Sequence, residues 1–224
     1  MIDLKQGDAF KIMDKMIKDG VKVDAIITDP PYNIARDNNF HTMWRSWIDF
    51  WEWDKGFDLY SWIDKWIKLL DKNGSMIIFN DWKNIWNIAK YAEERWMIIK
   101  DLIRLEKTNP MPRNRDRRYV TDFEVAVWLT MPKAKWVFNR QSDTYERPKY
   151  VWSIEKWFHP TQKNLWLMEW LIKIHTNEWQ TVLDPFMWSW TTGVAAKKLW
   201  RNFIWIEYEE KYFNIAKKRI EECC

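Results

Sequence analysis

The chain has 224 residues, which is enough for one hydrophobic core and at most a small appended subdomain. Its formal net charge of +4 and pI near 8.9 permit nucleic-acid binding without requiring it. The first residues lack the basic and apolar regions of a signal peptide, and no apolar run is long enough to span a membrane. Both cysteines, Cys223 and Cys224, lie at the C-terminal end and cannot form an internal disulfide framework, so we expect a cytoplasmic protein.

Short apolar runs alternate along the chain with amphipathic stretches, which predicts an α/β fold with a mostly parallel sheet in a single domain, 1–224. The predicted elements, in chain order, are strand 23–29, helix 61–74, strand 75–81, helix 84–95, strand 97–107, strands 123–130 and 134–139 as an antiparallel pair, helix 165–176, strand 181–186, helix 191–199, strand 202–207 and helix 210–222. Gly74 is expected to end the helix that precedes it. Two polar, charged stretches, 33–55 and 108–120, follow predicted strands and are expected to be loops at the ligand-binding edge of the sheet.

The motif Asp29-Pro30-Pro31-Tyr32 stands at the carboxyl end of a predicted strand. Its two prolines fix φ and hold the chain stiff and extended. The carboxylate of Asp29 and the carbonyl of Pro30 can then accept two hydrogen bonds from one amino group, while Tyr32 offers a flat face to a planar ring. We interpret the motif as a site for the exocyclic amine of a base; a proline-rich strand exit without a ligand is the alternative.

A second motif, VLDPFMWSWTTG at residues 182–193, has the outline of a strand, a tight turn and a helix. In Rossmann-like proteins such a turn brings the backbone against a cofactor, and the helix N-terminus offers its N–H groups. Glu207 ends the following strand, at a position where an acidic residue accepts hydrogen bonds from ribose hydroxyls. A solvated glutamate at a strand end is the alternative reading of Glu207.

Together, IITDPPYNI, HPTQK and DPF-x-x-S-x-TTG with an acidic strand end resemble the β class of amino-methylating DNA methyltransferases. The resemblance covers essentially the whole chain, and the catalytic motif precedes the donor motif as it does in that class. It implies a Rossmann-like fold that uses S-adenosylmethionine, with a circularly permuted motif order. The leading aspartate resembles the members that methylate adenine N6, whereas members that methylate cytosine N4 more often begin the motif with serine.

The resemblance also implies roles for individual residues. The positions that would hold the target base are Asp29, Pro30, Pro31 and Tyr32. The positions that would line the pocket of the methyl donor are Asp8, Thr161, Lys163, Asp184, Phe186, Ser189, Thr191, Thr192 and Glu207. The chain departs from the family pattern at Asn164, where a proline is usual, and at Trp188 and Trp190, where the donor loop has glycines.

The expected partner is DNA, and the expected contacts come from the two polar loops. The densest basic cluster lies in the second loop and consists of Arg113, Arg115, Arg117 and Arg118. These arginines are expected to bind phosphates, with one of them reading a guanine edge; a solvated charged loop is the alternative. We expect no metal site, because His41, His159 and His175 are scattered, and no membrane partner. The resemblance is compatible with a homodimer and with a cognate restriction endonuclease.

The chain contains 20 tryptophans and only 5 glycines, whereas average usage would give about 16 glycines. Five tryptophans lie among apolar or aromatic neighbours: Trp53, Trp62, Trp82, Trp128 and Trp136. The other fifteen include several that stand where turns favour glycine, and the full set is Trp44, Trp47, Trp51, Trp66, Trp86, Trp96, Trp152, Trp157, Trp166, Trp170, Trp179, Trp188, Trp190, Trp200 and Trp205. Glycine at all fifteen would give 20 glycines and leave five tryptophans, an ordinary composition.

Three interpretations follow from these patterns. The first is an active adenine-N6 DNA methyltransferase whose true sequence has glycine at many of these positions, as would arise if UGA codons that the source reads as glycine were decoded as tryptophan. The second takes the sequence literally, so that an indole at Trp188 or Trp190 projects where the donor must lie and leaves a DNA-binding protein without turnover. The third is a related enzyme that acts on cytosine N4 or on RNA.

Overall fold

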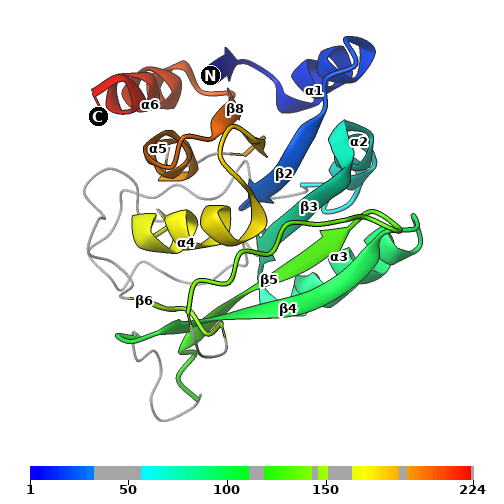
Figure 1. The fold of residues 1–224 in the computed structure, drawn as a ribbon, viewed down its shortest axis with the longest axis vertical. Coiled ribbons are helices and arrows are strands. Elements are labelled where there is room, and N and C mark those ends of the chain that lie inside the picture. The colour runs from blue at the N-terminus through cyan, green and yellow to red at the C-terminus, as the bar shows by residue number, and fades with distance from the viewer. Residues whose placement is uncertain (33–56, 111–118, 143–145, 151–162, 187–190, 223–224) are drawn as a thin grey trace.

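A single eight-stranded sheet organises the chain, with the strand order β1-β8-β7-β2-β3-β5-β4-β6 (Figure 1). The computed structural model describes residues 1–32, 57–110, 119–142, 146–150, 163–186 and 191–222. The strands are β1 (Ile2–Gln6), β2 (Val23–Thr28), β3 (Leu70–Asn80), β4 (Ile98–Lys107), β5 (Phe123–Thr130), β6 (Lys149–Tyr150), β7 (Thr181–Asp184) and β8 (Asn202–Glu207). The helices are α1 (Ala9–Lys18), α2 (Ser61–Leu69), α3 (Trp82–Glu93), α4 (Leu165–His175), α5 (Thr191–Lys198) and α6 (Glu210–Glu222).

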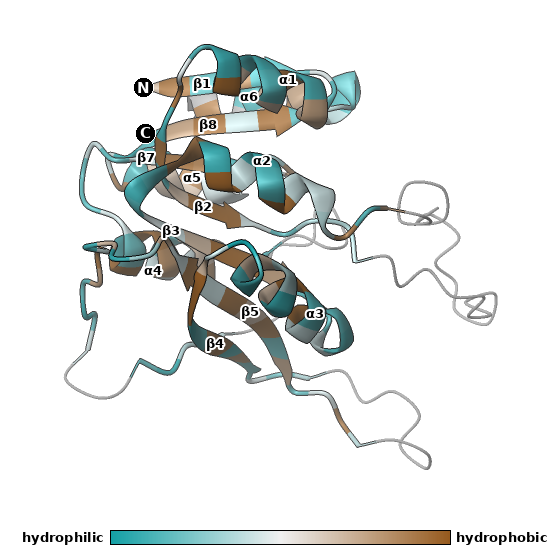
Figure 2. Cartoon of the chain, turned by 90° about the vertical axis from the view of Figure 1, so that its right-hand side faces the viewer, coloured by the Kyte–Doolittle hydropathy of each residue, from teal (hydrophilic) through white to brown (hydrophobic). Residues whose placement is uncertain are grey.

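The helices cover both faces of the sheet, so the fold has three layers. Side chains of α1, α2 and α3 pack with one face, to which β2 and β3 contribute Ile26 and Met76. Side chains of α4, α5 and α6 pack with the other face, to which the same strands contribute Ile27 and Ile77. This alternation follows from the two-residue period of a strand, and Figure 2 shows the apolar residues concentrated in the central strands. Among the described helices, none is long and apolar enough to cross a bilayer.

The prediction of a mostly parallel sheet is confirmed. β5 runs antiparallel to its neighbours β3 and β4, and the other described strand pairs are parallel. The predicted strand 134–139 is wrong, because this segment forms no ladder after the turn at Pro132 and Lys133. Its side chains pack on the sheet instead: the ring of Phe138 stacks on Trp128 at 5.4 Å between centroids.

The predicted helix 61–74 is too long, since α2 ends at Leu69 and β3 begins directly at Leu70. Gly74 therefore lies within β3, close to the shift in register against β2. A Cβ at Gly74 would lie 2.6 Å from Leu70 Cδ1 and 3.0 Å from the carbonyl oxygen of Asp24. Glycine is needed there for a close approach of two segments and not to end a helix. The strands β1 and β6 and the helix α1 were not predicted.

Three tryptophans adopt a backbone conformation that glycine adopts at the lowest cost. Among the described non-glycine residues, positive φ occurs at Trp96 (67°), Trp179 (68°), Trp200 (61°) and Lys133 (59°). Each of these tryptophans precedes a strand, and their side chains are 83%, 64% and 64% exposed. Because a left-handed conformation costs an L-residue about 1–2 kcal/mol, and an exposed indole recovers little by packing, tryptophan is a poor choice for these turns.

Other described members of the set of fifteen differ in their environments. Trp86 and Trp166 are exposed on helices, whereas Trp66 and Trp205 are fully buried. Trp66 packs as a core residue, and its indole N–H faces the sulfur of Met13 at 3.2 Å. The buried indole nitrogen of Trp205 has no hydrogen-bond partner among the residues that the structure describes. The structural argument for glycine is therefore strongest at the three positive-φ turns.

Replacing Trp96 with glycine should stabilise the fold relative to replacing it with alanine. Both substitutions remove the same exposed indole, but only glycine relieves the left-handed backbone, so the Trp96→Gly variant should unfold with a free energy about 1 kcal/mol higher than that of Trp96→Ala. Urea titration of both variants measures the difference. Equal stability of the two variants would show that the backbone at this turn is not strained.

Candidate active site

The carboxyl ends of five neighbouring parallel strands, β1, β8, β7, β2 and β3, lie along one edge of the sheet. Since β2 pairs with β7, the two sequence motifs that follow these strands meet although they are far apart in the chain. The contact is direct: the hydroxyl of Thr28, the last residue of β2, donates to Asp184 Oδ1 at 2.8 Å. In open α/β sheets, ligands bind outside this edge.

The Asp29-Pro30-Pro31-Tyr32 motif directly follows β2, and Pro30 and Pro31 are buried. The phenolic hydroxyl of Tyr32 donates to Asp29 Oδ1 at 2.5 Å. The amide of Asn84 on α3 donates to the carbonyl oxygen of Tyr32 at 2.6 Å and so fixes the end of the motif. The structure therefore holds a carboxylate and an aromatic ring together at the strand exit.

Burial controls the protonation of this pair. Burial raises the pKa of Asp29, and the neighbouring Lys163 ammonium partly opposes that increase. Burial and the nearby carboxylate of Asp29 raise the pKa of Tyr32 well above its usual value. Tyr32 therefore remains a neutral hydrogen-bond donor throughout the physiological pH range.

Lys163 contacts Asp29 and Tyr32, although the resemblance implied a place in the donor pocket. These three residues, with Glu124 and Lys107, form what we call the catalytic cluster, after the role that the resemblance implies for Asp29 and Tyr32. Its Nζ is 3.2 Å from Asp29 Oδ2 and 3.3 Å from the Tyr32 hydroxyl. Helix α4 begins just after it, and the side chain of Asn164 caps that helix by accepting the N–H of Leu167 at 3.2 Å. A proline, which the family usually has at position 164, has no side-chain acceptor for this bond, so the departure at Asn164 is accommodated by a helix cap.

Sequence reasoning missed two charged residues of the same cluster. Glu124 Oε2 lies 2.9 Å from Lys163 Nζ, and Glu124 Oε1 lies 2.9 Å from Lys107 Nζ. Glu124 is near the start of β5 and Lys107 ends β4, two strands that the resemblance did not connect with chemistry. The available signal was a glutamate in the otherwise apolar strand sequence FEVAVWLT.

Asp184 joins the two halves of the site. Both its oxygens are occupied: Oδ1 accepts from Thr28, and Oδ2 accepts from the hydroxyl of Thr192 at 2.8 Å. The backbone N–H of Phe186 also donates to Oδ1 at 3.3 Å, which closes the turn after β7. Asp184 is only 3% exposed, and burial raises its pKa to about 7. This carboxyl therefore holds the start of α5 against β2 and β7.

The other donor-pocket residues lie beside Asp184 along the same edge. The ring of Phe186 packs edge-on against Phe57 at 5.4 Å between centroids, and the side chains of Thr191 and Thr192 are buried. Glu207 ends β8 and accepts the backbone N–H of Glu209 at 2.8 Å. Burial is also the largest cause that raises the pKa of Glu207 to about 7.

Asp8 lies next to Glu207, because β1 and β8 are paired and Gln6 is in register with Glu207. Its carboxylate caps α1 by accepting the backbone N–H of Lys11 at 3.0 Å. The edge thus places two acidic side chains at adjacent strand ends, where they can accept hydrogen bonds from the hydroxyl and amino groups of a nucleoside.

Several predicted residues lie outside the described part of the chain. They are Thr161, Ser189, Arg113, Arg115, Arg117 and Arg118, together with Trp188, Trp190 and the whole of the loop 33–55. His175 is described: it is a core residue, 3% exposed, and burial lowers its pKa to about 3. Within the described ranges, no three His, Cys, Asp or Glu side chains are grouped so that they could hold a metal ion.

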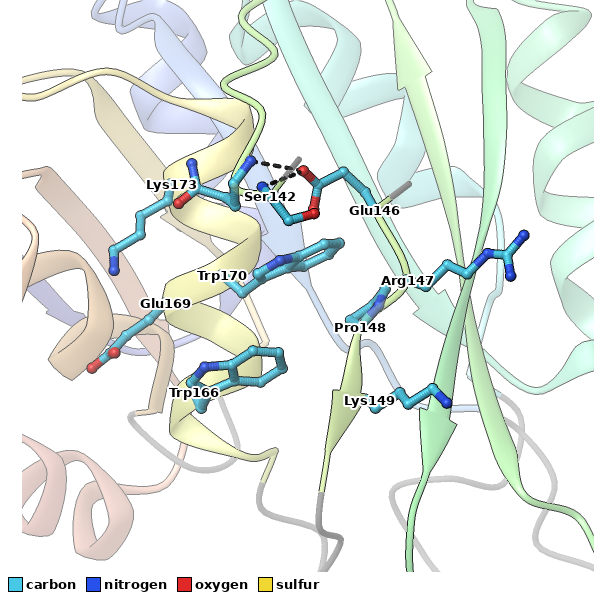
Figure 3. A pocket seen from close by; sticks show the side chains of 10 residues that line it. Ser142, Glu146, Arg147, Pro148, Lys149, Trp166, Glu169, Trp170 and Lys173 are labelled. Carbon is cyan, nitrogen blue, oxygen red and sulfur yellow. Dashed lines mark hydrogen bonds between the residues drawn. The ribbon is translucent and has the colours of Figure 1, made fainter. Parts of the chain in front are cut away.

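A cleft of about 610 Å³ lies between α4 and the residues around β6 (Figure 3). Trp166 and Trp170 of α4 form one wall, and Pro148 and Lys149 lie opposite them. None of the residues that line it belongs to the catalytic cluster or to the predicted donor pocket. The candidate site is therefore identified by its side chains at the strand ends and not by this cleft.

The raised pKa of Asp184 predicts a pH dependence of stability. A carboxyl that binds its proton more tightly in the folded state contributes stability that is complete below about pH 4 and is lost as pH rises through about 7. The Asp184→Asn variant lacks this loss, so its unfolding free energy relative to the parent should improve by about 1 kcal/mol or more between pH 4 and pH 8. Urea titrations at both pH values test this, and a difference that stays constant with pH would contradict it.

Comparison with known proteins agrees with this arrangement. The sequence profile of the N6/N4 DNA methylase family matches residues 23–218. The Type II methyltransferase M2.DpnII of Streptococcus pneumoniae is 33% identical over 240 residues, covering 97% of this chain and 89% of that protein. The Type II methyltransferase M2.MboI of Moraxella bovis is 30% identical, covering 98% and 88%.

Solved structures agree with the sequence matches. The crystal structure of an M1.HpyAVI–SAM complex is 48% identical, with a TM-score of 0.82 and coverage of 98% of this chain and 100% of that one. The cytosine-N4-specific PvuII DNA methyltransferase shares the fold alone, at 15% identity and a TM-score of 0.71, with coverage of 97% and 86%. The chain therefore belongs to the N6/N4 family of DNA methylases, and it is a β-class DNA methyltransferase that uses S-adenosylmethionine.

Proposed function

We propose that the chain methylates the N6 amino group of an adenine that has been rotated out of a DNA duplex. The observation that carries this proposal is the leading Asp29 of the base-binding motif, held by Tyr32 and Lys163 at the exit of β2. A fold that is shared with a cytosine-N4-specific enzyme does not distinguish the two amino groups, so the choice rests on the motif. The relatives named as Type II methyltransferases support a role in restriction–modification.

The residues of the donor side fit S-adenosylmethionine. Glu207 ends β8 and Asp8 follows the neighbouring strand β1 by two residues, and both provide acceptors for ribose hydroxyls and for an adenine amino group. Phe186 adds an apolar ring beside them, and the N-terminus of α5 lies at the same turn. When bound, S-adenosylmethionine supplies a methyl group that the amino nitrogen takes, while the electron pair of the broken carbon–sulfur bond stays on sulfur.

The catalytic residues act on the amino group of the target base. Rotation of the base out of the duplex costs a few kcal/mol, and stacking on Tyr32 offsets part of it. The amino nitrogen is a weak nucleophile because its lone pair is delocalised into the ring. The carboxylate of Asp29 and the carbonyl of Pro30 accept hydrogen bonds from its two N–H groups. These bonds favour a pyramidal nitrogen and stabilise the positive charge that develops on attack. The methylated nitrogen then carries a positive charge and loses one proton to water, which leaves a neutral methylamino group.

DNA contacts are proposed for the loops that flank this edge. The four arginines, Arg113, Arg115, Arg117 and Arg118, lie in sequence between β4 and β5. Those strands end at Lys107 and begin at Phe123, at the same edge as Asp29. Phosphate contacts from this segment, and from residues 33–55, would hold the duplex beside the base-binding motif.

Removing the acceptor should abolish methyl transfer. With the Trp188→Gly/Trp190→Gly variant as the parent, we expect Asp29→Ala to lower kcat at least about 100-fold while DNA binding persists, because the variant loses stabilisation of charge in the transition state only. Nucleoside mass spectrometry of DNA treated with the parent should find N6-methyladenine. If N4-methylcytosine is found instead, the adenine assignment is wrong, and methylation of RNA alone would exclude DNA as the substrate.

Whether the literal sequence can bind the donor depends on Trp188 and Trp190. We propose that both are glycine in the functional enzyme, and the positive φ at Trp96, Trp179 and Trp200 supports glycine at other members of the same set. The competing proposal is a DNA-binding protein without turnover, which bulky indoles in the donor loop favour. The first proposal requires a donor loop that admits S-adenosylmethionine, and the second requires a donor loop that excludes it.

Titration with S-adenosylmethionine separates the two proposals. The chain as written should bind the donor weakly, and the double variant Trp188→Gly/Trp190→Gly should bind it in the micromolar range. The Trp86→Gly variant is a matched control, because Trp86 is 71% exposed on α3 and belongs to neither sequence motif. Micromolar binding by the chain as written would refute the steric argument. UGG codons at the fifteen positions, or a native protein with the mass of the literal sequence, would refute the glycine proposal.

A further inference from the structure

We propose that Glu124 and Lys107 hold Lys163 against Asp29, so that Lys163 keeps the Asp29 carboxylate ionised when a base fills the site. Lys163 and Glu124 are thus positioning residues of the reaction. This inference rests on the proposed role of Asp29 as the acceptor for the amino group. It goes beyond that role by stating what maintains the charge of the acceptor.

The surroundings of the Lys163 ammonium define its position. A lysine ammonium has three N–H donors. Three acceptors surround Nζ: Glu124 Oε2 at 2.9 Å, Asp29 Oδ2 at 3.2 Å and the hydroxyl of Tyr32 at 3.3 Å. The side chain of Lys163 is only 13% exposed, so water contributes little to its solvation. Each of the three N–H groups of Lys163 therefore has an acceptor in the protein, and these contacts hold the ammonium beside the carboxylate of Asp29.

Glu124 has the matching arrangement on the other side. Its two carboxylate oxygens face two different ammonium groups, Lys163 and Lys107, each at 2.9 Å. Although burial alone would raise it, the two lysines lower the pKa of Glu124 to about 2. Glu124 is therefore a permanent anion, and Lys107 at the end of β4 holds it from behind.

The four charges form a neutral, largely buried row in the order Asp29, Lys163, Glu124 and Lys107. Removing one member would leave an uncompensated buried charge. A base that enters beside Asp29 displaces water, which strengthens the electrostatic interactions that remain and makes an unpaired carboxylate harder to maintain. Other groups that face Asp29 are Tyr32, which stabilises its anion, and the carboxyl groups of Glu124 and Asp184, which oppose it.

A titration of the Asp29 carboxyl tests the inference without requiring turnover. Carbon-13 NMR of the full-length chain follows the carboxyl resonances with pH, and Asp29→Asn identifies the resonance by its loss. We expect Lys163→Met to move the Asp29 midpoint upward by about 1 to 3 pH units, because an ammonium close to the carboxylate has been removed. We expect Lys163→Arg, which keeps the charge, to leave the midpoint close to that of the parent.

Turnover provides the second arm, measured in the Trp188→Gly/Trp190→Gly background. Glu124→Gln should lower kcat about tenfold with unchanged DNA affinity, because a charge-assisted hydrogen bond to Lys163 is lost. In the Lys163→Met background the same substitution should have little further effect on kcat, since both residues act through one interaction. Glu169→Gln is the matched control. Glu169 of α4 pairs with Lys198 of α5 at 3.3 Å, and the loss of this ion pair should change neither kcat nor the Asp29 midpoint.

The outcomes separate this inference from the proposed function. An Asp29 midpoint that stays constant or falls in Lys163→Met overturns the inference, as does a Glu124→Gln variant with parental kcat. Should Lys163→Met fail to fold, Glu124→Gln and Glu124→Ala carry the test, and parental kcat in both overturns it. Full methyl transfer by Asp29→Asn would instead refute the role of Asp29, whatever the titration shows.

Discussion

The hydrogen bonds of Asp184 are the interaction on which the site depends. This carboxyl binds Thr28 at the end of β2 and Thr192 at the start of α5, and it closes the turn after β7 through the N–H of Phe186. It therefore links the segment that we propose to hold the target base with the segment that follows the proposed donor loop. Methyl transfer needs its two reactants aligned in one geometry, and this buried group supplies a rigid reference for both.

Beyond this link, the site divides into two electrostatic environments. Near Asp29, two lysines and two carboxylates lie within ion-pair distance of one another, and the two lysines lower the pKa of Glu124. Near Asp184 and Glu207, burial favours the protonated carboxyl, with pKa values of about 7. Among the described residues, two ammonium groups lower the pKa of Glu124, and none contributes to the pKa of Asp184 or Glu207, although all three carboxyl groups are largely removed from water. A cationic donor approaching Glu207 would shift its equilibrium toward the carboxylate.

Much of the fold could be predicted because its signals are local. The apolar runs of β2, β7 and β8 and the periodic stretches of α3 to α6 lie close to their predicted ranges, and the alternation of apolar runs with amphipathic stretches indicated the mostly parallel sheet. The segment 134–139 misled the prediction because an apolar run that packs across a sheet resembles one that joins it. The end of the helix before Gly74 was predicted wrongly because a glycine that close packing requires cannot be distinguished in sequence from a glycine that ends a helix.

The site was only partly predictable for a related reason. Asp29 and Asp184 belong to motifs whose spacing indicates their chemistry. Glu124 and Lys107 belong to none, and their role arises only when β4 and β5 are folded against β3. A contact between residues of different strands has no signature in a single sequence. Lys163 shows the same limit, because its motif was identified but its partners were not.

The position of β1 has a consequence for how the protein forms during synthesis. β1, residues 2–6, pairs only with β8, residues 202–207, among the described strands, so the first strand made must wait for almost the last. On the other side of the sheet, by contrast, β2 pairs with β3, β3 with β5, and β5 with β4, and all four of these strands have been synthesised by residue 130. Contacts between residues far apart in sequence form slowly, and chains emerge from the ribosome N-terminus first. Strands β2, β3, β4 and β5 can therefore pair before β7 and β8 are made, whereas β1 can join the sheet only after β8 has been synthesised.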